Sequence, residues 1–354
     1  MDTIKYHNGL IRYNGRTVDH DAVAARFFNW SGSGFEFCFI GTSVSAKFVT
    51  GNINEPVPNE NERAYIGVFV DGSVYETARF PLDKNGGLYV LAEDLAVGTH
   101  TVRVVKETEM WYGKSGLVSL VCDGEFLPLS EKRKSMIEFI GDSITCGYGN
   151  LCSNRSPEFV TGEENFSNSY AAVTARDLGL SVSVIAASGN GFFHDYGCNT
   201  VNLIPELYEY SDKVFCSQIG IQPQKWDFSK DDCAAVVIKL GQNDRQYCSL
   251  ADLPEDSRYE SERKKRRKAF EETVYRFFER VCDLRPGVPI LFICEDDMML
   301  KPECLRAAQR TGRVGTLVFP SKKEYEGVGA NGHYSVYTHA RVARTLTDRL
   351  KEIL

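Results

Sequence analysis

The sequence has few features of an exported or membrane protein. Its 354 residues include no uninterrupted apolar run of eighteen, and its first residues, MDTIKYHN, lack the apolar core of a signal peptide. The eleven cysteines are an odd number and form no Cys-x-x-Cys pair, so they predict free thiols rather than a disulfide framework. We therefore expect a cytoplasmic protein that does not span a membrane.

Signatures of common cofactors are also missing. No His-x-x-x-His or clustered Cys/His spacing suggests a zinc site, and no Gly-x-Gly-x-x-Gly follows a predicted strand. We therefore predict neither a metal nor a nicotinamide cofactor. The formal net charge of −7 argues against polyanionic partners, so we expect no binding to nucleic acid or to an anionic membrane surface.

One basic run could suggest nucleic-acid binding. Residues 263–268 read RKKRRK, but they lie in a predicted helix whose apolar residues recur at helical spacing at Phe270, Val274, Phe277 and Val281. Glutamates also lie close to the run on both sides. We therefore interpret the run as a solvated helix face.

Residues 1–128 have the pattern of a β-sandwich. Short apolar runs alternate with turns rich in Gly, Asn and Pro, and no helix of three turns is expected. The clearest predicted strands are 35–40, 44–49, 65–70 and 101–105. A charged stretch at 130–134 then predicts a domain boundary.

Residues 135–354 alternate between strands and helices, which is typical of a parallel sheet covered by helices on both faces. The predicted strands are 136–140, 182–187, 234–240, 289–294 and 316–319, and the predicted helices are 168–178, 256–284 and 335–353.

A serine follows directly after the first strand of this second region. In IEFIGDSITCG (137–147), apolar strand residues lead to Gly141, which allows a sharp turn before Ser143. Ligands bind beyond the carboxyl ends of strands in open α/β sheets, so this placement nominates Ser143 as a nucleophile. Gly-Asp-Ser alone is ordinary turn chemistry, so the assignment depends on what else the chain supplies.

Two further motifs follow Ser143. The string GQND (241–244) ends another apolar run and places Asn243 at a strand end, and His333 lies just before the last predicted helix. A serine hydroxyl needs a base to become a good nucleophile, and His333 is the preferred candidate. His194 is its rival, because it follows the loop SGNG (188–191). For Asp142 and Asp244 we expect capping and loop hydrogen bonds.

The strings GDSITCGYG, SGNG and GQND and the late His333 resemble, in this order, the SGNH or GDSL-type hydrolase superfamily. The β-rich region, with SGSGFEF (31–37) and VRVVKETE (102–109), resembles the amino-terminal domain of the two-domain acetyl esterases of carbohydrate esterase family 2. The resemblance implies a jelly-roll β-sandwich followed by a three-layer α/β/α SGNH hydrolase domain with a parallel sheet.

The resemblance also implies a function. It suggests a serine acetyl esterase that deacetylates oligosaccharides derived from xylan, mannan or glucomannan. Ser143 would attack the acetyl carbonyl and His333 would accept its proton. The backbone N–H groups of Ser143 and Gly189 and the side-chain amide of Asn243 would form the oxyanion hole. This mechanism needs no metal or other cofactor.

The sequence departs from the family pattern beside the histidine. Relatives commonly carry Asp two residues before it, where this chain has Asn331. A carboxylate there would hold the imidazole in the correct tautomer. The Asn331 Oδ1 or a backbone carbonyl can instead accept the Nδ1–H bond. We predict a working Ser-His dyad, with Asn331 as a weak orienter of His333 or a bystander.

Trp111 and Tyr112 follow the VRVVKETE string and are candidates for stacking on a substrate sugar. Ordinary packing between the domains is the alternative role for both. Two other functions are considered for the whole chain. One is a GDSL-type esterase or lipase on other acyl esters. The other is a carbohydrate-binding protein with weakened catalysis, which the missing Asp suggests.

Overall fold

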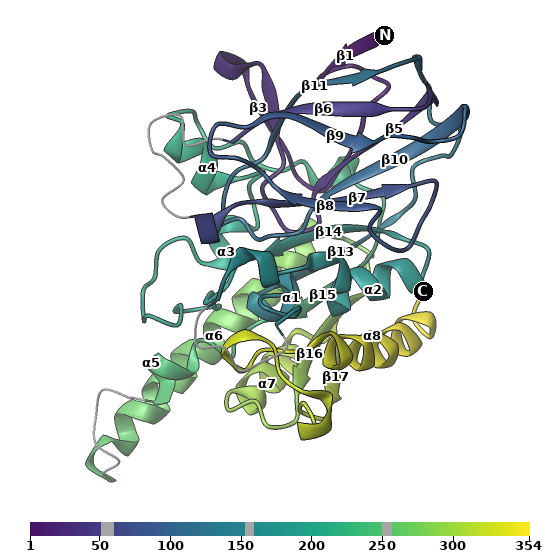
Figure 1. Cartoon of the computed structure of the whole chain (residues 1–354). Helices are drawn as coiled ribbons and strands as arrows, with labels where there is room; N and C mark the ends of the chain where they lie inside the picture. Colours follow the sequence, from purple (N-terminus) through teal and green to yellow (C-terminus); the bar gives the residue numbers. More distant parts are fainter. Residues whose placement is uncertain (51–59, 153–158, 250–256) are drawn as a thin grey trace.

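The computed structural model describes residues 1–50, 60–152, 159–249 and 257–354 (Figure 1). Its amino-terminal region folds into two antiparallel sheets that face each other. One sheet has the order β3-β4-β11-β6-β9, with β1 paired to β11, and the other has the order β12-β5-β10-β7-β8, with β2 paired to β5. The strands are β1 Asp2–Lys5, β2 Arg12–Asn14, β3 Val18–His20, β4 Ala25–Phe27, β5 Gly34–Gly41, β6 Val44–Val49, β7 Tyr65–Val70, β8 Ala78–Pro81, β9 Gly87–Ala92, β10 Gly98–Lys106, β11 Gly116–Cys122 and β12 Glu125–Leu127.

Alternation along the strands builds the sandwich core. In β5, Phe35, Phe37 and Phe39 are fully buried and point to the same side of the sheet. In β6 of the other sheet, Phe48 packs against this row, with its ring 6.3 Å from that of Phe35. The apolar faces of the two sheets therefore meet, as the sequence predicts for a β-sandwich.

The remaining residues form a five-stranded parallel sheet with the order β14-β13-β15-β16-β17. Its strands are β13 Met136–Gly141, β14 Ser181–Ala186, β15 Cys233–Lys239, β16 Ile290–Glu295 and β17 Val314–Phe319. The helices are α1 Ser143–Cys146, α2 Tyr170–Asp177, α3 Ile204–Leu207, α4 Lys213–Gln218, α5 Arg245–Ser249, α6 Glu260–Leu284, α7 Lys301–Thr311 and α8 Val336–Lys351.

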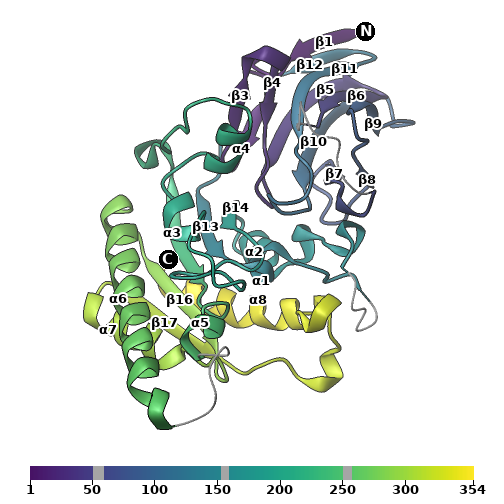
Figure 2. The ribbon, with the colours of Figure 1, turned by 90° about the vertical axis from the view of Figure 1, so that its left-hand side faces the viewer.

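Helices cover both faces of this sheet (Figures 1 and 2). In β15, Val237 faces the core beneath α2 and α8, whereas Val236 and Ile238 face the core beneath α6 and α7. The strands are buried on both sides, so they appear as continuous apolar runs in sequence. The predicted fold class, a jelly-roll sandwich followed by a three-layer α/β/α hydrolase domain, is confirmed.

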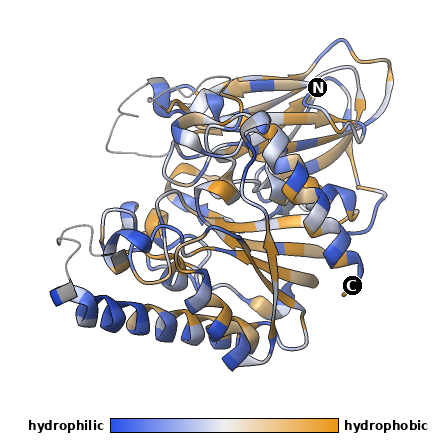
Figure 3. Cartoon of the chain, turned by 90° about the horizontal axis from the view of Figure 1, so that it is seen from below, coloured by the Kyte–Doolittle hydropathy of each residue, from blue (hydrophilic) through white to orange (hydrophobic). Residues whose placement is uncertain are grey.

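The basic run at 263–268 lies near the start of α6, which Figure 3 shows as a mainly hydrophilic helix beside mainly hydrophobic strands, and its lysines at 264, 265 and 268 are exposed. Lys264 pairs with Glu260, and Arg267 pairs with Glu303 on α7. The solvated-face interpretation is thereby confirmed. No helix formed by the described residues combines the length and the low charge that crossing a bilayer requires.

Buried polar contacts join the sandwich to the hydrolase domain. Arg16 of the sandwich is almost fully buried and pairs with Glu138 of β13 at 3.0 Å. Glu138 also pairs with Arg285, at the end of α6, at 3.0 Å. The Trp30 indole N–H donates to the Ser211 carbonyl at 2.8 Å. These contacts fix how the sandwich sits on the sheet that carries the site.

Candidate active site

Ser143 opens α1 directly beyond the carboxyl end of β13. A Cβ on Gly141 would lie 2.0 Å from Thr145 Oγ1, so only glycine fits this turn without displacing α1. The Asp142 carboxylate accepts a hydrogen bond from the Ile144 N–H at 3.1 Å and caps the helix. The capping role expected for Asp142 is confirmed, and Ser143 is held at the strand end.

The strand order explains why distant motifs meet. β13 lies between β14 and β15, and all three run parallel. Their carboxyl ends therefore share one edge of the sheet. Ser143 follows β13, the loop 188–191 follows β14, and Asn243 follows β15. Sheet topology thus gathers the three motifs that are separated in the sequence.

His333 reaches this edge from the loop before α8. Its Nε2 lies 2.9 Å from Ser143 Oγ, within hydrogen-bond distance. Burial lowers the pKa of the His333 imidazole to about 4, although the Ala330 carbonyl partly opposes the shift. The imidazole is therefore neutral near pH 7, the state in which Nε2 can accept a proton from the serine.

A backbone carbonyl orients the imidazole. The His333 Nδ1 lies 3.0 Å from the Ala330 carbonyl oxygen, so the Nδ1–H tautomer donates there and leaves Nε2 free as an acceptor. The Asn331 side chain instead donates from Nδ2 to the Tyr148 hydroxyl at 3.1 Å. Of the two roles expected for Asn331, the structure therefore favours the bystander, with the Ala330 carbonyl as the acceptor of the Nδ1–H bond.

Three donors lie at the same edge. None of the described residues accepts a hydrogen bond from the backbone N–H of Ser143 or of Gly189. Gly189 has φ +75°, a conformation that favours glycine. The Asn243 Nδ2 donates one hydrogen to the Asn190 carbonyl at 2.8 Å, which leaves its second N–H available. These three groups can meet a negative oxygen attached to the carbon that Ser143 attacks.

Asp244 fixes the loop that carries Gly189. Its buried carboxylate accepts from the backbone N–H groups of Phe192, Phe193 and His194 at 3.0, 2.7 and 2.8 Å. The Asp244 side chain therefore joins the loop after β14 to the loop after β15 by hydrogen bonds. The loop hydrogen bonds expected for Asp244 are confirmed.

His194 does not compete for the base role. Its ring stacks on Tyr247, with ring centroids 3.7 Å apart and an interplanar angle of 11°. The hydrogen bond to Ser143 Oγ comes from His333. His339, further along the chain, accepts from the Tyr170 N–H at its Nδ1 and is fully buried in the α2/α8 layer.

A row of aromatic rings borders the imidazole. The Tyr148 ring lies 4.5 Å from the His333 ring and stacks on Phe159 at 3.8 Å. Tyr112 of the amino-terminal domain packs against Phe159 at 5.1 Å. The structure thus brings Tyr112 to the border of the site, through packing with other rings. Trp111, its neighbour in sequence, is 39% exposed and open to solvent.

Glu109, to which no sequence motif assigns a role, lies behind the loop 188–191, the proposed oxyanion loop. Its side chain is fully buried, and Oε2 accepts from the Ser188 N–H at 2.6 Å. Burial raises the pKa of Glu109 to about 7, although its bond to Ser188 and the Lys106 ammonium oppose the shift. The sandwich therefore holds the residue immediately before Gly189.

These groups form the machinery for acyl transfer. A serine oxygen contacts a neutral imidazole, a carbonyl fixes the tautomer of that imidazole, and the loops that carry Gly189 and Asn243 end at the same edge of the sheet. The arrangement resembles a catalytic triad in which a backbone carbonyl replaces the third side chain.

Comparison with known proteins agrees with this geometry. Residues 13–129 match the family model described as Carbohydrate esterase 2 N-terminal. The cellulase/esterase CelE of Acetivibrio thermocellus is 31% identical over 98% of this chain, which spans only 40% of the length of that relative. An acetylxylan esterase / glucomannan deacetylase of Cellvibrio japonicus is 22% identical over 90% of this chain and 84% of its own length.

A solved structure extends the match to the whole fold. The family two carbohydrate esterase from Clostridium thermocellum, determined in complex with cellohexaose, superimposes with a TM-score of 0.81 and 28% identity. The superposition covers 97% of this chain and 98% of that one. The chain therefore resembles carbohydrate esterase family 2 over both of its domains.

Proposed function

We propose that the protein is a carbohydrate O-acetyl esterase that uses a Ser143–His333 dyad. The contact of 2.9 Å between His333 Nε2 and Ser143 Oγ is the observation that carries the proposal. A hydroxyl that is hydrogen-bonded to a neutral imidazole can lose its proton to the imidazole as it attacks an ester carbonyl.

The reaction proceeds in two halves. Ser143 Oγ attacks the acetyl carbonyl carbon, and its proton passes to His333 Nε2. The tetrahedral intermediate then expels the sugar alkoxide, which takes that proton from the imidazolium. Water, deprotonated by the same imidazole, attacks the acetyl-serine, and the second tetrahedral intermediate then releases acetate as Ser143 Oγ takes the proton back from His333 Nε2. The N–H groups of Ser143 and Gly189 and the Asn243 amide stabilise the oxyanion in both halves.

The substrate class rests on the relatives. An acetylated oligosaccharide of xylan, mannan or glucomannan type fits the name of the Cellvibrio japonicus relative and the cellohexaose bound to the clostridial esterase. Trp111 and Tyr112 are assigned to the sugar side of the site, where Trp111 is exposed and Tyr112 joins the aromatic row.

We also propose that the enzyme works in a reducing compartment such as the cytoplasm. No disulfide joins any of the cysteines, all of which lie in the described ranges, and Cys38, Cys122 and most of the others are buried. Imported oligosaccharides would then be the natural substrates, rather than polymer outside the cell.

Acetate release from acetylated manno- and xylo-oligosaccharides tests the proposal. We expect turnover by the wild type and a loss of about 10⁴-fold or more in Ser143→Ala and in His333→Ala. Product analysis by NMR identifies the hydroxyl position that loses its acetyl group. Normal turnover by Ser143→Ala would overturn the mechanism.

Ester chain length separates this function from that of a GDSL-type lipase. With p-nitrophenyl esters we expect the acetyl ester to be preferred over the butyryl and octanoyl esters. A preference for long acyl chains would favour the hypothesis of a GDSL-type lipase. Acetate release by the wild type would also exclude a carbohydrate-binding protein that has lost catalysis.

A further inference from the structure

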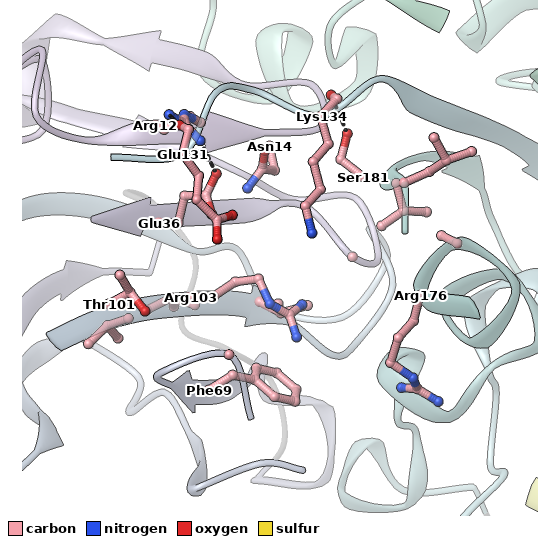
Figure 4. A pocket seen from close by; sticks show the side chains of 18 of the residues that line it. Arg12, Asn14, Glu36, Phe69, Thr101, Arg103, Glu131, Lys134, Arg176 and Ser181 are labelled. Carbon is pink, nitrogen blue, oxygen red and sulfur yellow. Dashed lines mark hydrogen bonds and ion pairs between the residues drawn. The ribbon is translucent and has the colours of Figure 1, made fainter. Parts of the chain in front are cut away.

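A recess between the two domains has no part in the mechanism above. Its volume is about 530 Å³, a size typical of small-molecule sites, and Figure 4 shows it from close by. Strands β2, β5 and β10 of the sandwich form one wall, and α2, the start of β14 and the linker at 129–134 form the other.

This recess is separate from the candidate active site. Lys134 precedes β13 and Ser181 begins β14, so both mark the amino ends of the strands. Ser143 follows the carboxyl end of β13. A six-residue strand spans about 20 Å, so the recess lies at the opposite edge of the sheet from the nucleophile.

The recess is cationic in a protein of net charge −7. Six basic and three acidic side chains line it. The basic ones are Arg12, Arg103, Lys132, Arg133, Lys134 and Arg176, and the acidic ones are Glu36, Asp71 and Glu131. Arg12 is neutralised by Glu36 at 3.2 Å. No carboxylate among the described residues lies within ion-pair distance of Arg103, Lys134 or Arg176.

The Arg103 guanidinium is held in place by an aromatic ring rather than by a direct ion pair. It lies 4.0 Å from the centroid of the Phe69 ring, which fixes its plane by a cation–π contact. Neighbouring protein atoms remove part of the water around the guanidinium, and this desolvation lowers the pKa of Arg103. The positive charge of Arg176 lowers it further, whereas the negative charges of Glu107 and Glu36 oppose the shift. An anion bound between Arg103 and Arg176 would offset the repulsion between the two guanidinium groups.

Neutral polar groups accompany the cations. Figure 4 shows Asn14, Thr101 and Ser181 around the recess, with the Lys134 ammonium group pointing into it. Apolar lining comes from Val105 and neighbouring aliphatic residues. Fixed guanidinium groups recognise carboxylate or phosphate, and amide and hydroxyl groups suit a polyhydroxylated skeleton.

We propose that this recess binds an acidic sugar, a monosaccharide unit that carries a carboxylate or a phosphate, between Arg103, Lys134 and Arg176. The site is independent of the proposed esterase function. The two sources of negative charge share the same recognition chemistry, so the test must distinguish them.

Calorimetric titration at low ionic strength tests the proposal, with D-glucuronate, glucose 6-phosphate, inorganic phosphate and neutral glucose as probes. We expect at least one acidic sugar to bind about tenfold or more tightly than glucose and than inorganic phosphate. Tighter binding of glucuronate identifies a carboxylate ligand, and tighter binding of glucose 6-phosphate identifies a phosphate ligand.

The double variant Arg103→Gln/Arg176→Gln should weaken this binding about tenfold or more. The matched control Lys264→Gln/Arg276→Gln removes two positive charges from the exposed face of α6 and should change it less than about twofold. Turnover of p-nitrophenyl acetate should be unchanged in both variants, which shows that each is folded.

Three results would overturn the proposal. Equal affinity for glucose and for both acidic sugars would show that charge is not recognised. An equal loss of affinity in the control variant and in the Arg103→Gln/Arg176→Gln variant would show that binding depends on the overall charge of the protein rather than on the recess. Absence of binding by every anionic probe in the millimolar range would show that the recess holds no acidic sugar.

Discussion

The Glu109 carboxylate of the sandwich accepts a hydrogen bond of 2.6 Å from the backbone N–H of Ser188 in the hydrolase domain. The next residue, Gly189, carries a proposed oxyanion donor. Glu109 is itself anchored, since the Lys106 ammonium donates to its backbone carbonyl at 2.6 Å. The sandwich thus positions part of the proposed oxyanion hole, although it contributes none of the groups in the proposed dyad.

Replacing Glu109 with Ala should lower kcat by about tenfold or more. Complete loss of an oxyanion donor costs about 100- to 1000-fold, and a shift of the Gly189 N–H forfeits part of that. KM should change little, because the donor acts on the transition state. Glu109→Gln should restore most of kcat, since its amide oxygen can still accept from Ser188. Steady-state kinetics on the acetyl ester measures both values.

Glu107 provides the matched control. It is equally buried in the domain interface, but its carboxylate accepts from the N–H and hydroxyl of Ser167, away from the oxyanion loop. Glu107→Ala should destabilise the fold yet leave the kcat of the folded enzyme within about threefold. An equal fall in kcat for both alanine variants would mean that Glu109 has only a general structural role.

Substitution of Asn331 should have little effect on catalysis. The Ala330 carbonyl, rather than the Asn331 amide, faces His333 Nδ1. Asn331 has φ +51°, so Asn331→Gly removes the side chain without straining the backbone. We expect kcat on the acetyl ester to stay within about threefold of wild type. A fall of a hundredfold would show that the amide does orient the imidazole during turnover.

Much of the fold could be predicted from the sequence because its strands are short apolar runs bounded by turn residues. The predicted strand 65–70 matches β7, Tyr65–Val70. Helix α7, Lys301–Thr311, is missing from the sequence-based expectation. Its buried residues include Cys304, Ala307 and Ala308, which give a weak apolar stripe. The packing of α7 against α6, which the sequence does not reveal, defines this helix.

Some residues of the candidate site could likewise be predicted from the sequence, and others could not. Ser143, Asn243 and His333 could be nominated because each lies in a motif beside a predicted element. The Ala330 carbonyl could not, because a backbone acceptor leaves no side-chain pattern. Glu109 could not either, since a charged residue near the end of a strand is normally expected at the surface, and its burial depends on the docking of the second domain.

The lowered pKa of His333 predicts activity in mildly acidic solution. An ordinary imidazole has a pKa near 6.5, whereas burial lowers that of His333 to about 4. Only the neutral imidazole can act as base, so kcat/KM should fall as pH drops through about 4 rather than through 6.5. The measurement is acetate release from an acetylated sugar across this range, with circular dichroism to verify the fold at each pH.

A fall of kcat/KM centred near pH 6.5 would contradict this expectation. It would mean that water reaches the imidazole in solution and restores an ordinary pKa. Stability should change in the same direction as activity, but over a higher range of pH. Unfolded His333 binds a proton below about 6.5 that the folded form excludes until about 4, so the free energy of unfolding should fall as pH drops through this window.

The buried network around Glu138 should be essential for stability. Its carboxylate pairs with Arg16 and Arg285 and accepts from the Tyr208 hydroxyl at 2.8 Å. Burial raises the pKa of Glu138, but the two guanidiniums outweigh it and hold the pKa below its usual value. Glu138→Gln would leave two buried cations with only one nearby carboxylate, from Asp231.

We therefore expect Glu138→Gln to lower the free energy of unfolding by about 3–5 kcal/mol, the cost of breaking a buried ion pair from one side. Glu209→Gln is the control, because Glu209 also binds an arginine bidentately, Arg280, but at the surface. Its loss should cost at most about 1 kcal/mol. Equilibrium urea unfolding of both variants measures the difference. Equal costs would show that the Glu138 network is solvated and that the domain interface is held mainly by its apolar contacts.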